Sequence, residues 1–329
     1  MAITARPDVP PPAPPTALPT ALIVAGPTCS GKSALALHLA RRLGGTVINA
    51  DSMQVYRELR VLTARPGPED EALAPHRLYG VRPAAEPGSV AWWREAALTE
   101  MAQARLPILC GGTGLYLAAL TQGLADVPPP TDAAREEARA LLAAEGAAAL
   151  HARLAGVDPR TAAGLRPSDG QRLARAWEVW RSTGRGLAEW QDAAPPPPPW
   201  RFRMILLDPP RPALRSAIAA RFATMLDQGG LAEAAGLLAL GLPPELPAMR
   251  AHGVPELLAH LRGELDLAEA TRRAVLATGQ YTKRQATWFR HRAPVPKTHT
   301  HMIHARFAGL EQFSESNWVD IESFIIGRG

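Results

Sequence analysis

The clearest chemical signal in the sequence is a loop suited to binding phosphate. Gly26, Gly31, Lys32 and Ser33 fit the pattern G-x-x-x-x-G-K-[ST]. Glycines let backbone N–H groups converge on an anion, and a helix that begins there adds a partial positive charge. Lys32 can neutralise phosphate oxygens, and the Ser33 hydroxyl can ligate Mg²⁺. We therefore expect an anion site made of Gly26, Pro27, Thr28, Cys29, Ser30, Gly31, Lys32 and Ser33.

An acidic side chain follows the next apolar run. Asp51 comes directly after residues 46–50, which have the composition of a buried strand. Ligands of open α/β sheets bind at the carboxyl ends of the strands, so Asp51 can serve as a general base or a metal ligand. An Asx turn or a helix cap is the structural alternative for the same residue. The run 107–110 ends in Gly111-Gly112-Thr113-Gly114, where a hydrolysing P-loop ATPase has an aspartate.

The elements that position these residues follow from the apolar pattern. Runs 21–25, 46–50, 107–110 and 203–207 predict buried parallel strands, and 33–43 has helical spacing. A strand, a helix and a strand in this order form a right-handed parallel βαβ unit. The sequence therefore predicts an α/β fold: a P-loop NTPase-like parallel sheet flanked by helices, with an inserted all-helical subdomain.

Proline-rich stretches mark the boundaries between segments. Residues 128–130 and 195–199 are proline runs around a block rich in Ala, Arg and Glu, which is typical of hinges around a subdomain. The first twenty residues have a composition that cannot bury a core. We divide the chain into a disordered tail at 1–20, a core at 21–126 and 201–292, a helical insertion at 127–200, and an unassigned tail at 293–329.

Composition narrows the class of protein. The 329 residues are 47% hydrophobic and 20% charged, as in a globular protein, and Cys29 and Cys110 match no metal-ligand spacing. Free thiols in a reduced, cytoplasmic protein are the simplest interpretation. No apolar stretch of about 18 residues predicts a membrane span. A net charge of +5 weakly favours a polyanionic partner.

Four motifs in order resemble the tRNA dimethylallyltransferase (tRNA isopentenyltransferase) family. They are Gly26–Ser33, Asp51–Arg57, Pro107–Tyr116 and Lys283–Arg290, and the resemblance covers roughly residues 21–292. Four separate motifs are far more specific than the P-loop alone. The chain departs from the family pattern at Val254 and Gly279, where tyrosine and arginine are usual.

The resemblance implies a reaction and roles for four residues. The family transfers a dimethylallyl group from dimethylallyl diphosphate to the N6 amine of the adenosine 3′ of the tRNA anticodon, and it releases diphosphate. By this resemblance the P-loop holds the diphosphate with Mg²⁺ at Ser33, and Asp51 accepts the amine proton. Thr113 lies near the target nucleotide, and Arg221 assists at the diphosphate. Without the resemblance, Arg221 would be interpreted as an exposed helix arginine.

The resemblance also implies a set of tRNA contacts. We expect the insertion and the C-terminal helices to clasp the anticodon loop, with the adenosine flipped out of its stack. The residues expected to contact tRNA are Asp51, Ser52, Met53, Gln54, Thr113, Arg135, Gln171, Arg172, Leu173, Ala174, Arg175, Arg250, Lys283, Arg284, Gln285 and Arg290. No obligate protein partner is expected, and a monomer is favoured.

Three alternatives share the P-loop. A small-molecule or nucleotide kinase would need an adenine site for ATP, which no sequence element identifies. A GTP switch would need a guanine-reading N-K-x-D element, which is missing from the sequence. An isopentenyltransferase that acts on free adenylates needs no macromolecular acceptor, whereas the large insertion and the basic segments favour one.

Overall fold

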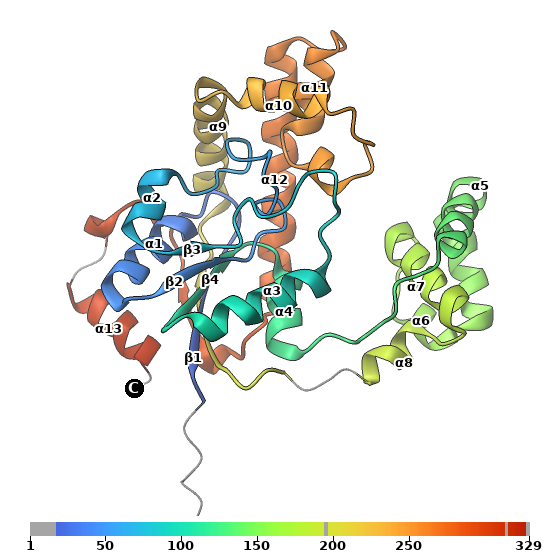
Figure 1. Cartoon of the computed structure of the whole chain (residues 1–329), viewed down its shortest axis with the longest axis horizontal. Coiled ribbons are helices and arrows are strands. Elements are labelled where there is room, and N and C mark those ends of the chain that lie inside the picture. Colours follow the sequence, from blue (N-terminus) through green and yellow to red (C-terminus); the bar gives the residue numbers. More distant parts are fainter. Residues whose placement is uncertain (1–17, 194–196, 313–314, 327–329) are drawn as a thin grey trace, which may run out of the picture. The chain divides into compact units, whose positions relative to one another are not determined.

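The centre of the molecule is a sheet of six parallel strands in the order β3-β2-β4-β1-β5-β6 (Figure 1). The computed structural model describes residues 18–193, 197–312 and 315–326. The strands are β1 Thr20–Ala25, β2 Thr46–Asn49, β3 His76–Arg77, β4 Pro107–Gly111, β5 Arg201–Leu207 and β6 Thr300–Ile303. All four strands expected from the apolar runs are present, and the predicted parallel α/β fold is confirmed.

Helices surround this sheet in the unit that contains it. They are α1 Lys32–Leu43, α2 Pro68–Leu73, α3 Val90–Gln103, α9 Arg211–Asp227, α10 Gly230–Ala239, α11 Val254–Leu261, α12 Leu267–His291 and α13 Glu315–Ile326. Helix α4 Gly114–Gln122 begins in this unit and continues into the second one at Leu117. Short 3-10 turns lie at Pro247–Arg250, Lys297–His299 and Leu310–Gln312. Helix α1 packs on β1, β2 and β4, which fixes the P-loop between the central strand and the start of a helix.

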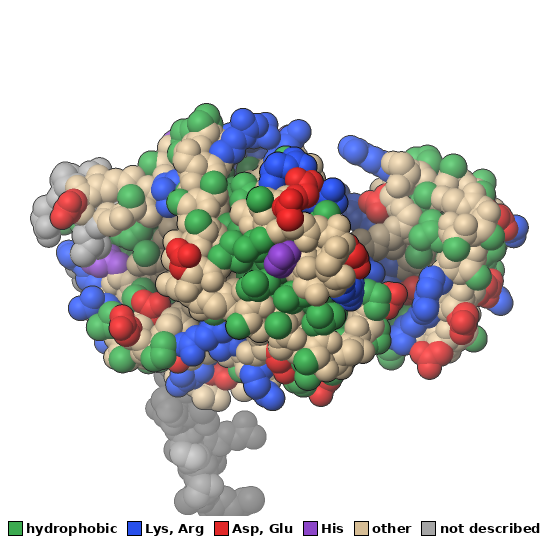
Figure 2. Space-filling model, turned by 90° about the horizontal axis from the view of Figure 1, so that it is seen from above, with side chains coloured by type: hydrophobic (Ala, Val, Ile, Leu, Met, Phe, Trp, Pro, Cys, Tyr) green, Lys and Arg blue, Asp and Glu red, His purple; other side chains and the backbone are tan. Residues whose placement is uncertain are grey.

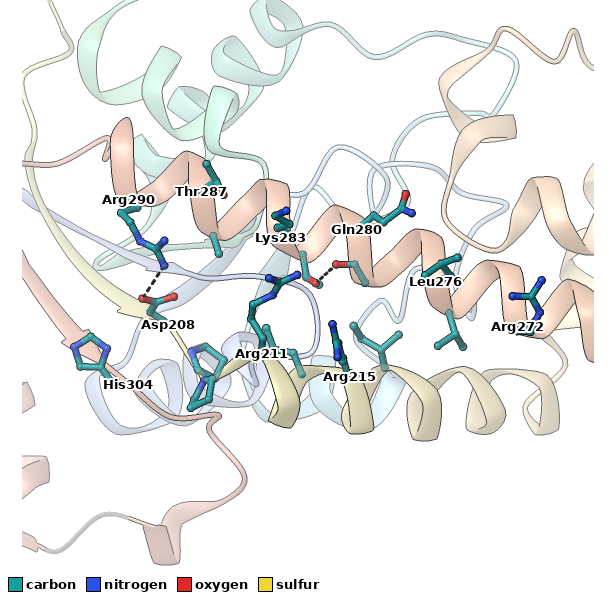
Figure 3. Close-up of a pocket in the computed structure, with 18 residues that line it drawn as sticks. Asp208, Arg211, Arg215, Arg272, Leu276, Gln280, Lys283, Thr287, Arg290 and His304 are labelled. Carbon is teal, nitrogen blue, oxygen red and sulfur yellow. Dashed lines mark hydrogen bonds and ion pairs between the residues drawn. The ribbon is translucent and has the colours of Figure 1, made fainter.

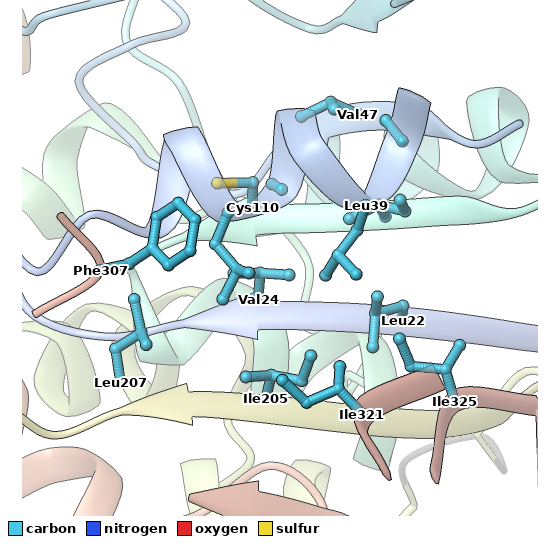
Figure 4. Close-up of a cluster of buried hydrophobic side chains, with 14 of the residues drawn as sticks. Leu22, Val24, Leu39, Val47, Cys110, Ile205, Leu207, Phe307, Ile321 and Ile325 are labelled. Carbon is cyan, nitrogen blue, oxygen red and sulfur yellow. The ribbon is translucent and has the colours of Figure 1, made fainter. Parts of the chain in front are cut away.

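The sheet core includes the C-terminal segment that the sequence pattern left unassigned. Strand β6 pairs with β5, and Phe307, Trp318, Ile321 and Ile325 join Leu22, Val24, Leu39, Ile205 and Leu207 in one buried cluster (Figure 4). At the other terminus, β1 begins at Thr20 and pairs with Arg201, so the predicted tail boundary at residue 20 is one residue too late. Residues 1–17 of that predicted tail lie outside the described residues.

A second compact unit covers Leu117–Pro198 and is helical, as predicted for the inserted block. Its helices after α4 are α5 Asp132–Val157, α6 Pro159–Ala163, α7 Gly170–Thr183 and α8 Leu187–Asp192. Its own core contains Leu150, Leu154, Leu173 and Trp177. Among the described residues, α5 alone has the length and hydropathy for a membrane span, but non-helical Gly146 (φ 80°) divides it. Each part is shorter than the about 20 residues that a span requires.

Candidate functional site

The P-loop lies where its motif requires, between β1 and α1. Gly31 precedes the helix with φ 91°, and a Cβ at this position would lie 2.1 Å from the carbonyl oxygen of Phe307. No larger residue fits there without moving the backbone. Lys32, the first residue of α1, is buried with its side chain at the cavity described below. The loop therefore has the geometry of an anion cradle.

The segment after β6 supports this loop from outside. The Arg306 guanidinium donates from Nε to the Cys29 carbonyl oxygen at 2.8 Å, and the Phe307 amide donates to the Ser30 carbonyl oxygen at 2.9 Å. Cys29 has a positive φ of 65°, which is rare outside glycine. Sequence reasoning missed Arg306 and Phe307, because they lie in a weakly patterned tail and match no motif.

Gln285 joins the P-loop to the end of β4. Its Oε1 accepts hydrogen bonds from the Thr28 amide at 2.9 Å and the Thr28 hydroxyl at 3.3 Å, and its Nε2 donates to the Gly112 carbonyl oxygen at 3.0 Å. The residue is 4% exposed. A Cβ on Gly112 would lie 2.2 Å from Nε2, so glycine is needed opposite this amide. Gln285 was expected to contact tRNA, but its amide is buried and bonded within the protein, so we assign it to positioning the P-loop.

Asp51 forms a local turn and also lines the cavity described below. Its Oδ1 accepts a hydrogen bond from the Met53 amide at 3.0 Å, which is the Asx turn of the structural alternative. Its own amide donates to Asn49 Oδ1 at 2.8 Å, and its side chain lines the cavity. Thr113 Oγ1 accepts from the Ser52 amide at 3.0 Å, so the end of β4 also fixes the residue after Asp51. The carboxylate is thus held in place and reaches the cavity.

A cavity of about 310 Å³ brings together eleven of the predicted site residues. The expected residues that line it are Thr28, Cys29, Lys32, Ser33, Asp51, Ser52, Met53, Gln54, Arg221, Arg250 and Arg284. Arg221 reaches it from α9, where it donates to Cys29 Sγ at 3.7 Å and to the Thr63 carbonyl oxygen at 3.3 Å. The interpretation of Arg221 as an exposed surface residue is therefore wrong. Leu62, Ile218, Phe222 and Met225 form an apolar part of the wall.

An aromatic pair in the same cavity was not predicted. The His252 and Tyr281 rings lie 4.5 Å apart, and the Arg284 guanidinium lies 5.5 Å from the Tyr281 ring centre. Burial, and then the negative charge of Asp51, raises the pKa of Tyr281 to about 12. Burial, and then the positive charge of Arg284, lowers the pKa of His252. Both rings are therefore neutral near pH 7 and offer a surface on which a planar group can stack.

The two cysteines are free and buried, as expected. Burial raises the pKa of the Cys110 thiol to about 11, against the opposing effects of Lys32 and of a hydrogen bond with Ser33. Cys110 is therefore a neutral thiol beside the P-loop helix. Among the described residues, no group of three or more His, Cys, Asp or Glu side chains is arranged to hold a metal ion.

The other predicted tRNA contacts lie in the helical unit, which is described here by itself. Arg135 pairs with Asp132 at 2.9 Å, Arg172 lies 3.5 Å from Asp169, and Arg175 lies 3.6 Å from Glu178. Arg135, Arg172 and Gln171 are exposed, while Ala174 and Arg175 are half-buried. Leu173 is fully buried in the core of this unit, so its side chain supports the helix and does not face a ligand.

Helix α12 divides its predicted contacts between two faces. Arg284 lines the cavity already described, whereas Lys283 and Arg290 line a separate cavity of about 860 Å³ between α9 and α12 (Figure 3). Gln285 is buried. Adjacent residues of a helix point about 100° apart, so a contiguous basic segment cannot present every side chain to one ligand.

Comparison with known proteins points to one family. The sequence profile described as IPP transferase matches residues 54–292, and the profile described as isopentenyl transferase matches residues 19–87. The chain is 62% identical to the tRNA dimethylallyltransferase of Granulibacter bethesdensis, over 92% of this chain and 97% of that protein. It is also 62% identical to the tRNA dimethylallyltransferase of Gluconobacter oxydans, over 93% and 94%.

Solved structures agree with this relationship. A tRNA isopentenylpyrophosphate transferase from Bacillus halodurans matches with a TM-score of 0.65 and 31% identity, over 94% of this chain and 96% of that one. A eukaryotic dimethylallyltransferase acting on tRNA matches with a TM-score of 0.78 and 23% identity, over 95% of this chain and 81% of that one. The second likeness is one of fold.

Proposed function

The chain belongs to the IPP transferase family, and from this premise we propose how its site performs the reaction. The protein is a prenyltransferase that modifies tRNA. It transfers a dimethylallyl group from dimethylallyl diphosphate to the N6 amine of the adenosine 3′ of the anticodon. One observation carries the proposal: the P-loop and Asp51 line the same cavity, so a diphosphate leaving group and a proton acceptor can face one substrate.

The P-loop is the site of the leaving group. As the bond between C1 of the dimethylallyl group and the diphosphate oxygen breaks, negative charge grows on the diphosphate. The loop amides and the Lys32 ammonium lie where this charge develops, and Arg221 reaches the same loop through Cys29. Fixed positive groups at such a position stabilise the transition state more than the ground state.

The apolar wall suits the group that is transferred. Ile218, Phe222 and Met225 on α9, together with Leu62, give the cavity an apolar part of its wall. Binding of the five-carbon chain here would be stabilised by roughly 25 cal/mol of transfer free energy for each Å² of apolar surface removed from water. We assign this wall to the dimethylallyl group and the polar side to the diphosphate.

Asp51 is the proposed general base. The exocyclic amine of adenine is a weak nucleophile, and a carboxylate that accepts its hydrogen bond orients it toward C1. The new N6–C1 bond forms while C1–O breaks, and the amine proton passes to Asp51. The neutral His252–Tyr281 pair offers the adenine a stacking surface, and Thr113 fixes Ser52 next to the base.

Mg²⁺ is the proposed cofactor, and the residues at the P-loop fit it. This ion keeps several waters and takes only one or two protein ligands together with substrate phosphates. The Ser33 hydroxyl at the cavity wall would supply one such ligand, and a cluster of three acidic side chains is not required. When bound, the ion would neutralise charge on the diphosphate.

We further propose tRNA contacts from each unit separately, made by Arg135 and α7 in one unit and by Arg250 and Arg284 in the other. Arg135, Arg172, Arg250 and Arg284 are exposed, and basic side chains bind the RNA backbone. A monomer in the cytoplasm fits this role, because unmodified tRNA and dimethylallyl diphosphate are both water-soluble substrates.

A transfer assay tests the proposal. Labelled dimethylallyl diphosphate and Mg²⁺ are incubated with the protein and either unmodified tRNA or AMP and ATP. Label is expected in tRNA alone. Label in free nucleotide would identify an adenylate prenyltransferase, and phosphorylation of a small acceptor by ATP without prenyl transfer would identify a kinase and refute the proposal.

A further inference from the structure

We propose that the cavity between α9 and α12 is a second nucleic-acid site, which holds the sugar–phosphate backbone of the tRNA outside the active-site cavity. This inference rests on the proposed function for the identity of the RNA. Five basic residues line the cavity: Arg211, Arg215, Arg272, Lys283 and Arg290. We call this site the α9–α12 groove.

Two helices supply these charges from opposite sides. Arg211 and Arg215 are one turn apart on α9, and their side chains rise toward α12 (Figure 3). Lys283 and Arg290 are seven residues apart on α12 and share its groove-facing side. The positive charge is thus concentrated in one hollow. Figure 2 shows one face of the molecule, on which basic side chains form several groups and some of them lie beside acidic side chains.

Most of this charge is not neutralised. Among the described residues, Asp208 is the one acidic residue that lines the groove, and its carboxylate lies 4.0 Å from Arg290. Arg211, Arg215 and Lys283 have no ion pair among the described residues. Arg272 is paired with Glu269 at the far end. Unpaired cations held near one another repel, and an anionic ligand removes that repulsion.

The groove is distinct from the active-site cavity. A small apolar cluster of Cys29, Leu214 and Ile218, with Val275 packed against it, lies between the two. Cys29 lines the active-site cavity, Leu214 and Val275 line the groove, and Ile218 lines both. A ligand in the groove therefore contacts α9 and α12 without reaching Asp51 or Lys32, neither of which lines it.

The spacing of the charges favours an extended polyanion over a small phosphate. Arg272 and Arg290 are on one continuous helix, and 1.5 Å per residue separates them by about 27 Å along its axis. A single diphosphate cannot bridge that length, whereas consecutive RNA phosphates can follow it. The chain's acceptor is itself such a polyanion, so the groove fits a second stretch of the same molecule.

The test compares two double variants that remove the same charge. R211A/R215A empties the α9 side of the groove. R41A/R105A removes two exposed arginines at the end of α1 and before β4, at the edge of the sheet opposite the P-loop. Affinity for unmodified tRNA is measured without donor over a series of salt concentrations. Each phosphate contact contributes about 0.7–0.9 to the slope of log K against log salt.

We expect R211A/R215A to bind tRNA at least several-fold more weakly. The magnitude of the slope of log K against log salt should fall by about 1–2. R41A/R105A should leave the tRNA affinity and its salt dependence nearly unchanged. R211K/R215K should recover most of the affinity, which separates charge from folding. The donor KM and the kcat at saturating tRNA should stay at the level of the unmodified protein, because the groove does not contact the reacting groups.

Three results would overturn the inference. Equal tRNA affinity and slope in R211A/R215A and the unmodified protein would show that RNA does not use the groove. Equal losses in both double variants would show only a general effect of net charge. A raised donor KM with unchanged tRNA affinity would assign the groove to a small phosphate ligand. Because binding is measured without turnover, these outcomes are separate from a failure of prenyl transfer.

Discussion

Gln285 holds Thr28: its Oε1 accepts the Thr28 amide hydrogen at 2.9 Å, while its Nε2 donates to the Gly112 carbonyl oxygen at 3.0 Å. One side chain of α12 therefore connects the P-loop with the end of β4. The same helix carries Tyr281 and Arg284 into the cavity. A change in the position of α12 is in this way transmitted to the loop that binds the leaving group.

Replacing this amide should damage the donor site more than the tRNA site. Gln285→Ala leaves the partly buried Thr28 amide and the buried Gly112 carbonyl without their hydrogen-bond partner, at a cost of about 1–3 kcal/mol for a fully buried group. We expect the KM for dimethylallyl diphosphate to rise roughly tenfold or more, with tRNA affinity unchanged. Steady-state kinetics with each substrate varied, and a separate tRNA binding assay, measure the two effects. Weaker tRNA binding with an unchanged donor KM would instead favour direct contact between Gln285 and RNA.

Asp51→Asn separates the turn from the chemistry. The asparagine Oδ1 can still accept from the Met53 amide, so the Asx turn at this position is retained. Its amide cannot accept a proton, and we expect kcat to fall by about 10²–10⁴-fold. Tm and tRNA affinity should stay close to those of the unmodified protein. A variant that turns over normally at saturating substrates would exclude Asp51 as the base.

Gly31→Ala should abolish donor binding. The added Cβ meets the Phe307 carbonyl oxygen at 2.1 Å and the residue must keep φ 91°. Gly229→Ala is the matched control, because Gly229 also has a positive φ (96°) but nothing lies within 4 Å of its Cβ position. The control should lose only about 1–2 kcal/mol of stability. Thermal melting and donor binding are measured for both variants. Similar donor binding in the two would show that the contact between a Cβ at position 31 and Phe307 does not disturb the P-loop.

His252 should make the stability of the protein depend on pH. Burial and Arg284 lower its pKa, against an opposing effect of Asp51, so the folded state favours the neutral ring that stacks on Tyr281. The unfolded chain takes up a proton near pH 6.5. This contribution is therefore complete above about pH 6.5 and is lost as the pH falls below it.

His252→Phe keeps an aromatic ring and removes the titration. We expect its Tm to fall less than that of the unmodified protein between pH 7.5 and pH 5.5. The pKa values of His38 and His301 are also lowered, mainly by burial. Both histidines are present in the variant and in the unmodified protein, so their contributions to the pH dependence of Tm cancel in the comparison. Parallel Tm curves across this range would show that His252 contributes nothing.

Strong local patterns predicted the central part of the fold. The apolar runs that became β1, β2, β4 and β5 are buried on both faces, which gives them an uninterrupted hydrophobic composition. Strand β6 is short, lies at the sheet edge and keeps Met302 exposed, so its pattern is too weak to identify. The helix α13 depends on the sheet for its burial, and the sequence does not show that contact.

The candidate site was predictable by position more than by role. The P-loop and Asp51 were found because strand ends and glycine spacing fix where they lie. The roles of the residues along α12 were harder to predict. A sequence does not show whether a glutamine such as Gln285 is buried or faces RNA. Helical periodicity could have separated Lys283 from Arg284, since consecutive residues point to different sides. His252 and Tyr281 matched no motif and needed the fold to bring them together.

The bond from Arg306 to the Cys29 carbonyl oxygen joins residues 277 positions apart in the chain. During synthesis the ribosome releases the P-loop long before Arg306. The loop therefore lacks this support until residue 306 has left the ribosome. A nascent chain that has already formed strands β1 to β5 is still without the bond from Arg306, so we expect it to bind the donor more weakly than the folded protein does.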